Sequence, residues 1–580
     1  MTVSISAIAN CDDAVVSWKI DKPIPDCFGF AILREKREPG GVKRATLYNR
    51  TGFAKDQPKP NETRPSTVWP FQRFSWADHS VGTGDDVRYR VSPMVRANGQ
   101  LEQRIDLRSP WTPWLVLSGD AGQKTSAFFN RGLVISQFMA RYLEDLRVEQ
   151  GLATRKQALA AFKKSLDQHD LPIRAFLGGV LRERMLELLA TAKTRKQHVF
   201  GALYELEDEE LVAALAKLGS RGHLVLANGS IQKRKGEDLA AARKRDQNKK
   251  ARAVLKKAGL ELHGRFVSPG ALGHNKFLVI CDPRKEPVAA WTGSTNWTKT
   301  GLCTQINNGL LVEHRDFARV YLEQWERLHK AGNAFPKDLV DANSKAKPVA
   351  VGKSKMTIWC TRTRGKLDLA ALDDEVNGAK DGILFLMFQP GAAGTLGTVN
   401  KLLARPGKLY IKGVVSTLPP ESADDESTVK VSVFGDAKRH RVSLDVVQPS
   451  GHARPFANFA AEVTRGEFLS DVGFAIVHSK LIVIDPFGKR PTVITGSHNF
   501  SGAASEKNDE NFVIVRGNRE LALEYSAHVL SVYQHYRWRS VVQSMARTGK
   551  RPEALLQETD GWQARFMKGP SRREIDFWVR

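Results

Sequence analysis

The sequence predicts an α/β protein in which two similar α/β sandwich repeats share one pseudo-twofold site, preceded by an all-β sandwich domain. A pattern of residues that starts at His274 and recurs at His478 indicates the repeats. Each copy surrounds an apolar run that is typical of a buried strand. Short runs of alternating apolar and polar residues in the first 117 positions indicate the all-β domain. With 580 residues, the chain is long enough to bury several hydrophobic cores.

The first domain, residues 1–117, is predicted to be a β-sandwich. Turns that contain Gly or Pro separate its alternating runs. The early Trp18, a Tyr-x-Val strand at Tyr89 and the length of the segment resemble the pattern of a fibronectin type III domain. We expect this domain to act as a spacer, or as a docking module for a protein partner, rather than as a catalytic unit.

Helical and α/β patterns follow in order along the chain. Residues 118–196 place apolar residues three and four positions apart, which predicts a helical connector. Strand and helix patterns then alternate in two later segments, and this alternation predicts an α/β sandwich in each. The predicted units are a first repeat at 197–335, a polar linker at 336–354, a second repeat at 355–548 and a C-terminal extension at 549–580.

The net charge indicates the kind of partner that the protein binds, and the cysteines indicate its cellular compartment. The chain has 88 Lys and Arg residues against 63 Asp and Glu residues, a formal net charge of +25. This excess favours a polyanion, such as nucleic acid or an anionic membrane surface. The five cysteines are few and are not spaced like a metal site, so we expect a cytoplasmic protein. The start lacks the features of a signal peptide, and no apolar run approaches the roughly 20 residues of a membrane-spanning helix.

The repeated pattern carries groups suited to phosphate chemistry. Each copy offers an imidazole, an ammonium group, a hydroxyl and an amide in the same order. The first copy contains His274, Lys276, Asp282, Ser294 and Asn296, and the second contains His478, Lys480, Asp485, Ser497 and Asn499. The separation from the Asp to the Asn is 14 residues in both copies. A lone His-x-Lys is a weak signal, but two complete copies with matching spacing are specific.

The pattern resembles the signature of the phospholipase D superfamily, in which His-x-Lys is followed by four residues, an Asp and then Gly-Ser-x-Asn. The second copy matches this signature fully. The first copy departs from it, because Cys281 stands at the Asp position and Asp282 follows one residue later. We expect one extra residue just before Asp282, as a bulge at the end of the strand. The resemblance implies that the catalytic residues are the His, Lys and Asn of both copies: His274, Lys276, Asn296, His478, Lys480 and Asn499.

The resemblance also implies supporting residues. Family members often carry a carboxylate or an amide eleven residues after the motif Asn, where it orients a histidine. These positions are Asn307 and Glu510 in this chain. Partners of different charge would give the two histidines different basicities, as one nucleophile and one acid require. The expected supporting set is completed by Ser294, Ser497, Asp282 and Asp485.

These groups predict that a phosphodiester is cleaved in two steps. The lysines counter the charge of the phosphate, while the motif asparagines and serines donate hydrogen bonds to its oxygens. One neutral imidazole attacks phosphorus and forms a covalent phosphohistidine, and the other, protonated, serves the leaving group and then the water. The resemblance implies that His274 is the nucleophile and His478 the acid and base, which the residues alone leave open. No metal or cofactor is expected, because the lysines carry the charge.

The identity of the phosphodiester stays open at this stage. Our leading prediction is a phospholipase D-type hydrolase of phospholipid head groups, as in phosphatidylcholine, with peripheral contact to an anionic membrane. The alternative is a metal-independent nuclease acting on DNA or RNA. The net charge favours this alternative, as do eleven Lys or Arg residues against three acidic residues in 233–257. An inactive scaffold is the weakest alternative, and the oligomeric state is undecided.

Overall fold

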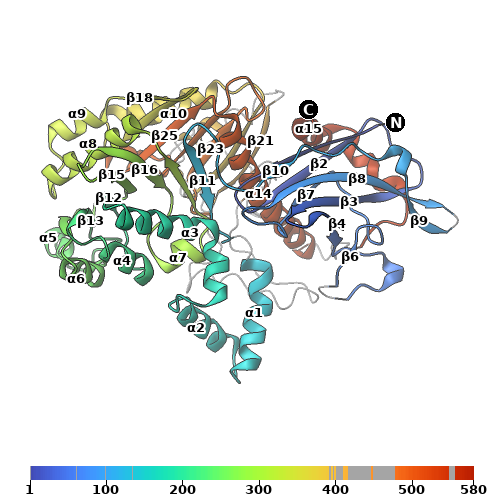
Figure 1. Ribbon diagram of the computed structural model, residues 1–580, viewed down its shortest axis with the longest axis horizontal. Coiled ribbons are helices and arrows are strands. Elements are labelled where there is room, and N and C mark those ends of the chain that lie inside the picture. Colours follow the sequence, from blue (N-terminus) through green and yellow to red (C-terminus); the bar gives the residue numbers. More distant parts are fainter. Residues whose placement is uncertain are drawn as a thin grey trace. The chain divides into compact units, whose positions relative to one another are not determined.

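The structure is a computed structural model that describes residues 2–59, 62–97, 99–132, 135–388, 390, 394–395, 397–399, 409–415, 446–447, 477–547 and 555–580. The chain forms two compact units. The first contains Met1–Gly119 and Val541–Arg580, and the second contains the described residues between Asp120 and Ser540. Figure 1 labels their helices and strands.

The N-terminal part of the first unit is all-β, as predicted. One sheet has the order β1-β2-β7, with strands β1 (Val3–Ala9), β2 (Ala14–Ile20) and β7 (Ser75–Asp78). A second sheet has the order β10-β8-β3-β4, with β9 paired to β8. Its strands are β3 (Cys27–Glu38), β4 (Gly41–Thr46), β8 (Asp86–Ala97), β9 (Gln100–Gln103) and β10 (Leu115–Val116). A small third sheet pairs β5 (Tyr48–Asn49) with β6 (Arg64–Pro65).

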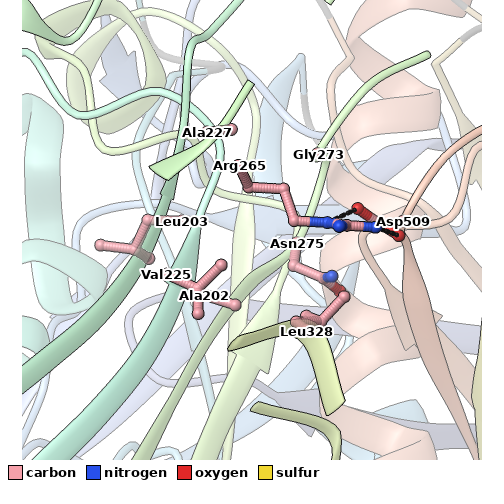
Figure 2. A pocket seen from close by; sticks show the side chains of 9 residues that line it. All are labelled: Ala202, Leu203, Val225, Ala227, Arg265, Gly273, Asn275, Leu328 and Asp509. Carbon is pink, nitrogen blue, oxygen red and sulfur yellow. Dashed lines mark hydrogen bonds and ion pairs between the residues drawn. The ribbon is translucent and has the colours of Figure 1, made fainter. Parts of the chain in front are cut away.

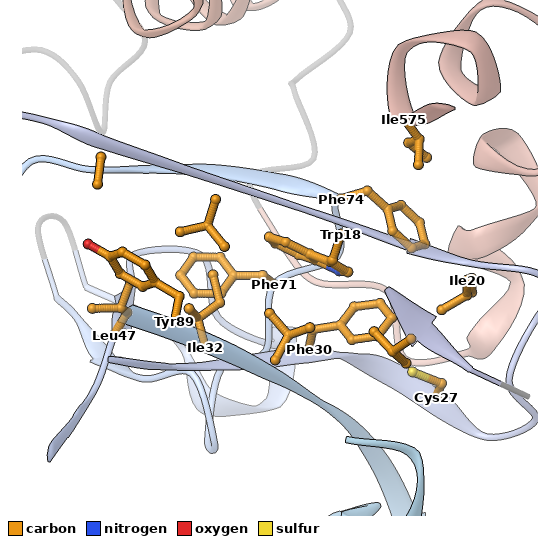
Figure 3. Close-up of a cluster of buried hydrophobic side chains, with 14 of the residues drawn as sticks. Trp18, Ile20, Cys27, Phe30, Ile32, Leu47, Phe71, Phe74, Tyr89 and Ile575 are labelled. Carbon is orange, nitrogen blue, oxygen red and sulfur yellow. The ribbon is translucent and has the colours of Figure 1, made fainter. Parts of the chain in front are cut away.

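Aromatic residues from both larger sheets fill one core in this unit (Figure 3). Trp18 from β2 packs edge-on against Phe30 from β3, with ring centroids 5.7 Å apart. The end of the chain completes this core. Trp562, in a 3-10 helix at Asp560–Phe566, packs against Phe30 at 6.0 Å, and Ile575 from α15 (Gly569–Trp578) joins the same cluster. The described part of the expected C-terminal extension, 549–580, therefore supplies core residues to the first domain.

The second unit is built from two mixed sheets with the same plan. The first sheet has the order β11-β17-β16-β15-β12-β13-β14. Its strands are β11 (Thr125–Phe129), β12 (His198–Leu203), β13 (Gly222–Ala227), β14 (Glu261–Arg265), β15 (Lys276–Cys281), β16 (Pro287–Gly293) and β17 (Asn308–Val312). Strands β12, β13 and β14 are parallel, while β15 runs antiparallel to β12.

The second sheet repeats this order as β19-β25-β24-β23-β20-β21-β22 and adds β18 at the edge beside β19. Its strands are β18 (Lys347–Val351), β19 (Ser354–Cys360), β20 (Gly382–Met387), β21 (Tyr410–Val415), β22 (Val446–Val447), β23 (Leu481–Ile484), β24 (Thr492–Gly496) and β25 (Asn511–Arg516). The directions match as well, because β20 and β21 are parallel and β23 is antiparallel to β20. The repeat that the sequence predicts is thus a repeat of topology, and the α/β fold class is confirmed.

Helices accompany both sheets. Helix α8 (Arg315–Ala331) follows β17 and contacts β12, β13, β15 and β16, while α14 (Arg519–Arg547) occupies the equivalent chain position after β25. The other helices of this unit are α1 (Ile135–Glu149), α2 (Arg155–Ser165), α3 (Pro172–Thr194), α4 (Glu209–Ala216), α5 (Leu239–Arg243), α6 (Lys249–Lys257), α7 (Lys299–Cys303), α9 (Lys337–Asn343), α10 (Leu367–Asn377) and α13 (Gly502–Glu506).

The connecting segments differ in detail from the expected boundaries. The helical connector at 118–196 also contains β11, which pairs with β17 at the edge of the first sheet. The linker at 336–354 contains α9 and β18, and β18 pairs with β19 of the second sheet. Both segments therefore belong to the folded unit, since an edge strand uses the free backbone groups of its neighbour.

Candidate active site

Each motif lies at equivalent ends of two neighbouring strands. Lys276 is the first residue of β15, and Lys480 directly precedes β23. Gly293 ends β16 and Gly496 ends β24. A Cβ atom at either glycine would lie 2.3 Å from a carbonyl oxygen of the neighbouring strand, so only glycine fits there. This close approach sets the start of the Ser-x-Asn segment against the adjacent strand.

The strand register is irregular beside the first motif, but the extra residue lies on β16 and not, as predicted, just before Asp282: Ile280 pairs with Ala289 and Cys281 with Pro287, so Val288 is passed over. Pairing between β15 and β16 shifts between Ile280 and Cys281, whereas β23 and β24 pair without a shift. The irregularity lies at the end of β15 farther from His274. The extra residue therefore leaves the ends of the strands that carry His274 and Lys276 unchanged.

The two histidines exchange partners between the repeats. Nδ1 of His274 lies 3.3 Å from Oε1 of Glu510, which belongs to the second repeat. Nδ1 of His478 lies 2.9 Å from Oδ1 of Asn307, which belongs to the first. All four side chains are buried. Each half of the molecule thus holds the histidine of the other half, and the two motifs form a single site.

The lysines occupy matching places. Lys276 Nζ donates to the carbonyl oxygen of His274 at 2.9 Å, and Lys480 Nζ donates to that of His478 at 2.5 Å. Each ammonium group also faces an aromatic ring. Lys276 Nζ lies 5.1 Å from the ring centroid of Tyr204, and Lys480 Nζ lies 4.5 Å from that of Phe388.

The two aromatic residues also contact the histidines. The ring of Tyr204 lies 4.8 Å from that of His274, and the ring of Phe388 lies 4.6 Å from that of His478. Our sequence reasoning did not include them in the site. The signal was present, however, because each is the first residue after the apolar strand that pairs with a motif strand, β12 in one repeat and β20 in the other.

The motif asparagines and serines contact carboxylates and neighbouring asparagines. Asn296 Nδ2 donates to Oε2 of Glu205 at 2.6 Å, and the backbone N–H of Asn499 donates to Oε2 of Glu510 at 3.1 Å. Ser294 Oγ donates to Oδ1 of Asn307 at 2.7 Å. Ser497 Oγ accepts the backbone N–H of the first residue of β25 at 3.0 Å, as Ser294 Oγ accepts that of the first residue of β17 at 3.1 Å. Both hydroxyls therefore hold the strands that carry the histidine partners.

Asp282 and Asp485 lie at the opposite strand ends from the histidines. The Asp485 carboxylate accepts backbone N–H groups of Lys380, Asp381 and Gly382 at 2.7–3.2 Å, at the start of β20. Asp282 accepts the N–H groups of residues 284 and 286, at 2.8 and 2.9 Å, within its own turn. The structure brings the histidines, lysines, asparagines and serines together, and it places these two carboxylates in turns.

A second set of polar contacts also links residues of the first repeat to residues of the second. Asn308 Nδ2 donates to Thr495 Oγ1 at 2.8 Å, and the equivalent Asn511 accepts from Thr292 Oγ1 at 2.7 Å. Asn511 Nδ2 also donates at 2.8 Å to Oδ1 of Asn275, which directly follows His274. These contacts join the two sheets behind the catalytic groups.

A buried ion pair fixes the segment that carries Glu510. Arg265 at the end of β14 binds the Asp509 carboxylate through Nε and Nη2, at 2.7 and 3.1 Å (Figure 2). The side chains of both residues are almost fully buried, with 2% and 1% exposed. A bidentate pair of this kind fixes orientation. The backbone next to Glu510 is therefore anchored to the first sheet.

Burial and like charges lower the pKa values of the basic groups in the site. Burial and the neighbouring Lys276 lower the pKa of His274 to about 4, although Glu510 opposes this shift. Burial, with Lys480, Lys276 and His274 nearby, lowers the pKa of His478 well below its usual value. Both imidazoles are therefore neutral at pH 7 before an anion binds.

The remaining charged groups respond in the same way. Burial lowers the pKa of Lys276 to about 7 and that of Lys480 well below its usual value. Burial alone would raise the pKa of Glu510, but His274 and the hydrogen bonds of the site hold it at about 2. The described groups present four nitrogen bases to the site, together with the carboxylates of Glu510 and Glu205. An anion fits this set, because a bound negative charge would restore the protons on the lysines.

Comparison with known proteins identifies this arrangement. Residues 185–329 and 426–532 match the family model for "Cardiolipin synthase, PLD-like domain". A curated relative, "Phospholipase D" of Rickettsia felis, is 48% identical over 59 residues, which are 10% of this chain. This match spans 27% of the relative's own length.

Among solved structures, the phosphatidylserine synthase of Haemophilus influenzae Rd KW20 is 11% identical, with a TM-score of 0.38 over 64% of this chain and 91% of that one. Nuc from Salmonella typhimurium, a phospholipase D family member, is 18% identical, with a TM-score of 0.19 over 32% of this chain and 96% of that one. Yeast tyrosyl-DNA phosphodiesterase is 11% identical, with a TM-score of 0.31 over 57% and 85% of the two chains. Scores this low do not identify a substrate.

The family match covers both motifs and falls on the two repeats that exchange histidine partners. The two repeats of this chain are therefore similar to a phospholipase D-like domain over the matched residues.

Proposed function

We propose that this protein is a phosphodiesterase that cleaves its substrate through a covalent phosphohistidine on His274. The observation that carries the proposal is the crossed pairing of the two histidines, one with a carboxylate and one with an amide. Two neutral imidazoles in one buried basic site provide a nucleophile and a proton carrier for the same phosphorus.

In the first step, Nε2 of His274 attacks phosphorus and the bond to the leaving oxygen breaks. His478, protonated once the anionic substrate is bound, gives its proton to that oxygen. Lys276 and Lys480 neutralise the charge on the non-bridging oxygens, and Asn296 and Asn499 are placed to donate to them. In the second step, neutral His478 takes a proton from water. The resulting hydroxide displaces His274 by breaking the N–P bond.

The different partners support this division of roles. A carboxylate beside Nδ1 of His274 stabilises the positive charge that the imidazole gains when Nε2 binds phosphorus. The neutral amide of Asn307 gives His478 no such stabilisation, so its imidazolium is the stronger acid. Because the bound anion restores the protons on Lys276 and Lys480, which then balance its charge, we expect the reaction to need no metal, and activity to survive EDTA.

A trapping experiment tests the proposal. A substrate with a good leaving group should label the His478→Ala variant covalently, since the intermediate forms but its hydrolysis lacks a base. The label should be acid-labile and map to His274 by mass spectrometry. The matched variant His274→Ala should stay unlabelled. Labelling of His478 in the His274→Ala variant would reverse the assignment, and full activity of either variant would reject the mechanism.

Two classes of phosphodiester remain as substrates, each supported by a separate observation. The short match to a curated phospholipase D supports a phospholipid head group, with peripheral contact between the protein and the membrane. No helix in the described part of the chain has the length and apolarity needed to cross a membrane. The position of the basic segment 233–257 supports nucleic acid.

The basic segment connects the end of β13, at the edge of the sheet that carries the site, to the start of the parallel strand β14 at the opposite edge. It contains α5 and α6, and Asn248 turns its side chain inward between them. Asn248 Nδ2 donates at 2.8 Å to the carbonyl oxygens of both Tyr204 and Ala227. The exposed Lys249 and Lys250 directly follow Asn248, which is hydrogen-bonded to Tyr204, the residue whose ring contacts that of His274.

Substrate preference can be measured directly in EDTA. Phosphatidylcholine vesicles, vesicles that also contain anionic lipid, single-stranded DNA and double-stranded DNA should be compared with the His274→Ala variant as the blank. For a nucleic-acid substrate, Lys249→Gln/Lys250→Gln should raise KM and reduce its salt dependence. Lys193→Gln/Lys196→Gln is the control, since these exposed lysines precede β12, at the end away from Tyr204. Turnover of vesicles alone, unaffected by either pair, would select the phospholipid.

A further inference from the structure

A chain of histidines lies at the other end of the first sheet from the catalytic site. Strands β12, β13 and β14 run parallel, and His198, His223 and Glu261 stand at or near their first residues. Tyr204, whose ring contacts that of the catalytic His274, directly follows the last residue of β12. The two groups of titratable side chains therefore occupy opposite edges of one sheet.

Hydrogen bonds connect these histidines through the carboxylate of Glu261. His223 Nδ1 lies 2.5 Å from Oε2 of Glu261, and His263 Nε2 lies 2.7 Å from Oε1 of the same residue. His198 Nδ1 lies 3.0 Å from His223 Nε2. Glu261 and His263 are two residues apart on β14, so their side chains share a face of the sheet.

Helix α8 brings a further imidazole to that face. The ring of His329 in its last turn lies 3.6 Å from the ring of His263. One turn earlier, Trp325 stacks on His329 at 5.2 Å, and its Nε1 donates to the carbonyl oxygen of Gly201 at 3.1 Å. Arg265 of β14 donates to the carbonyl oxygen of Ala334, just beyond the helix, at 2.9 Å. The helix end and the strand are thus held together on both sides of the histidine pair.

We propose that Glu261, His263 and His329 form a binding site for a divalent transition metal ion such as Zn²⁺. One ligand atom from each residue lies within 4.8 Å of the others. A zinc ion bound at about 2.0–2.2 Å from two imidazole nitrogens and a carboxylate oxygen needs only a small closure of these side chains. Imidazole with carboxylate is a ligand set that suits Zn²⁺, Cu²⁺ and Ni²⁺ rather than Mg²⁺ or Ca²⁺.

The surroundings favour binding over a simple hydrogen-bonded network. His223 binds the carboxylate oxygen that faces away from His263, which orients Glu261 as an outer partner does at metal sites. Glu261 and His329 are exposed and His263 is partly exposed, so an ion can enter and water can complete its coordination.

This site lies apart from the phosphodiesterase chemistry. An ion there would join the edge strand β14 to the end of α8 and stabilise the first repeat. Removal of the metal should therefore lower thermal stability while the chemical step continues. The site and the phosphohistidine mechanism can consequently succeed or fail independently.

The test uses the full chain without an affinity tag that contains histidine. After EDTA treatment and desalting, Zn²⁺ and Co²⁺ are titrated by calorimetry, and Co²⁺ coordination is followed by its visible absorption. We expect one ion per chain, a rise in Tm on binding and loss of this ion in both His263→Ala and His329→Ala. His223→Gln should weaken binding by about 10–100-fold, as loss of an outer partner does.

His314→Ala is the matched control, because His314 caps the opposite end of α8. It should bind the ion as the unchanged protein does. Circular dichroism of each variant without metal establishes that it is folded. The proposal is overturned if the folded wild-type chain binds no ion, or if binding persists unchanged in His263→Ala and His329→Ala.

Discussion

The two halves of the active site differ in the group that meets each histidine. His274 meets the carboxylate of Glu510, whereas His478 meets the amide of Asn307, and the strands around them share the same order and directions. The difference is therefore chemical and not architectural. A duplicated scaffold gives each histidine the same position, and a single carboxylate or amide then sets its basicity. The two imidazoles of a symmetric fold can in this way take unequal roles.

Removing the imidazoles tests the comparison most severely. His274→Ala and His478→Ala should each lower kcat/KM on the order of 10³–10⁴-fold, because nucleophile and acid act on one phosphorus. The double variant should fall little further, since the residues act as a unit. Steady-state turnover of a chromogenic phosphodiester in EDTA measures all three. Effects that simply multiply would mean that the histidines act independently.

Exchanging the partners tests the difference itself. Glu510→Gln should lower turnover by about 10²–10³-fold, as loss of a group that stabilises developing charge does. Asn307→Asp should raise the pKa of His478, because a carboxylate favours the imidazolium. The double exchange should make His478 the better nucleophile, detected by mapping the phosphohistidine. Labelling that stays on His274 after the exchange would show that position, not partner charge, decides the role.

The pH dependence should show the influence of bound substrate. For the free protein, kcat/KM should fall below the His274 pKa of about 4, as the nucleophile gains a proton. It should also fall at higher pH, as His478 and then Lys276, with a pKa of about 7, lose theirs. An anionic substrate raises the pKa values of both, so the alkaline limb of kcat should lie at higher pH than that of kcat/KM. If the alkaline limbs of kcat and kcat/KM fell at the same pH, bound substrate would not raise these pKa values as expected.

Replacing the two motif aspartates should have the smallest effect on turnover. Asp485→Asn removes a carboxylate that accepts three backbone N–H groups, so it should lower the free energy of unfolding by about 1–3 kcal/mol. Asp282→Asn, in an exposed turn with two such bonds, should cost less. Chemical denaturation compares them, and kcat should change less than about tenfold in folded protein. A large loss of kcat with unchanged stability would show that these residues take part in the chemical step.

Much of the fold and of the site could be predicted from local patterns. The apolar runs predicted the motif strands, and the resemblance to the phospholipase D superfamily implied that Asn307 and Glu510, eleven residues after each motif Asn, are the partners of the histidines. The spacing of residues in the sequence does not show which histidine each partner contacts. That exchange depends on long-range packing between the repeats, through pairs such as Asn308 with Thr495. Tyr204 and Phe388 were missed for a related reason, because an aromatic residue at a strand end is usual in any buried core.

The sequence also did not reveal the metal-ligating residues of the first sheet or the break between α5 and α6. Glu261 and His263 are close in the chain, but His329 reaches them only through the packing of α8. The break between α5 and α6 arises because Asn248 satisfies buried carbonyl groups. A polar residue within a helical pattern does not reveal such distant acceptors.

The burial of Trp562 in the N-terminal sandwich has a consequence for synthesis of the protein. The strands of that domain leave the ribosome long before the indole and Ile575 that fill their core. Domains usually fold in the order of their synthesis, but this one must wait with part of its interior open to water or to a chaperone. Termination of synthesis before Trp562 would thus damage a domain whose strands had already been made.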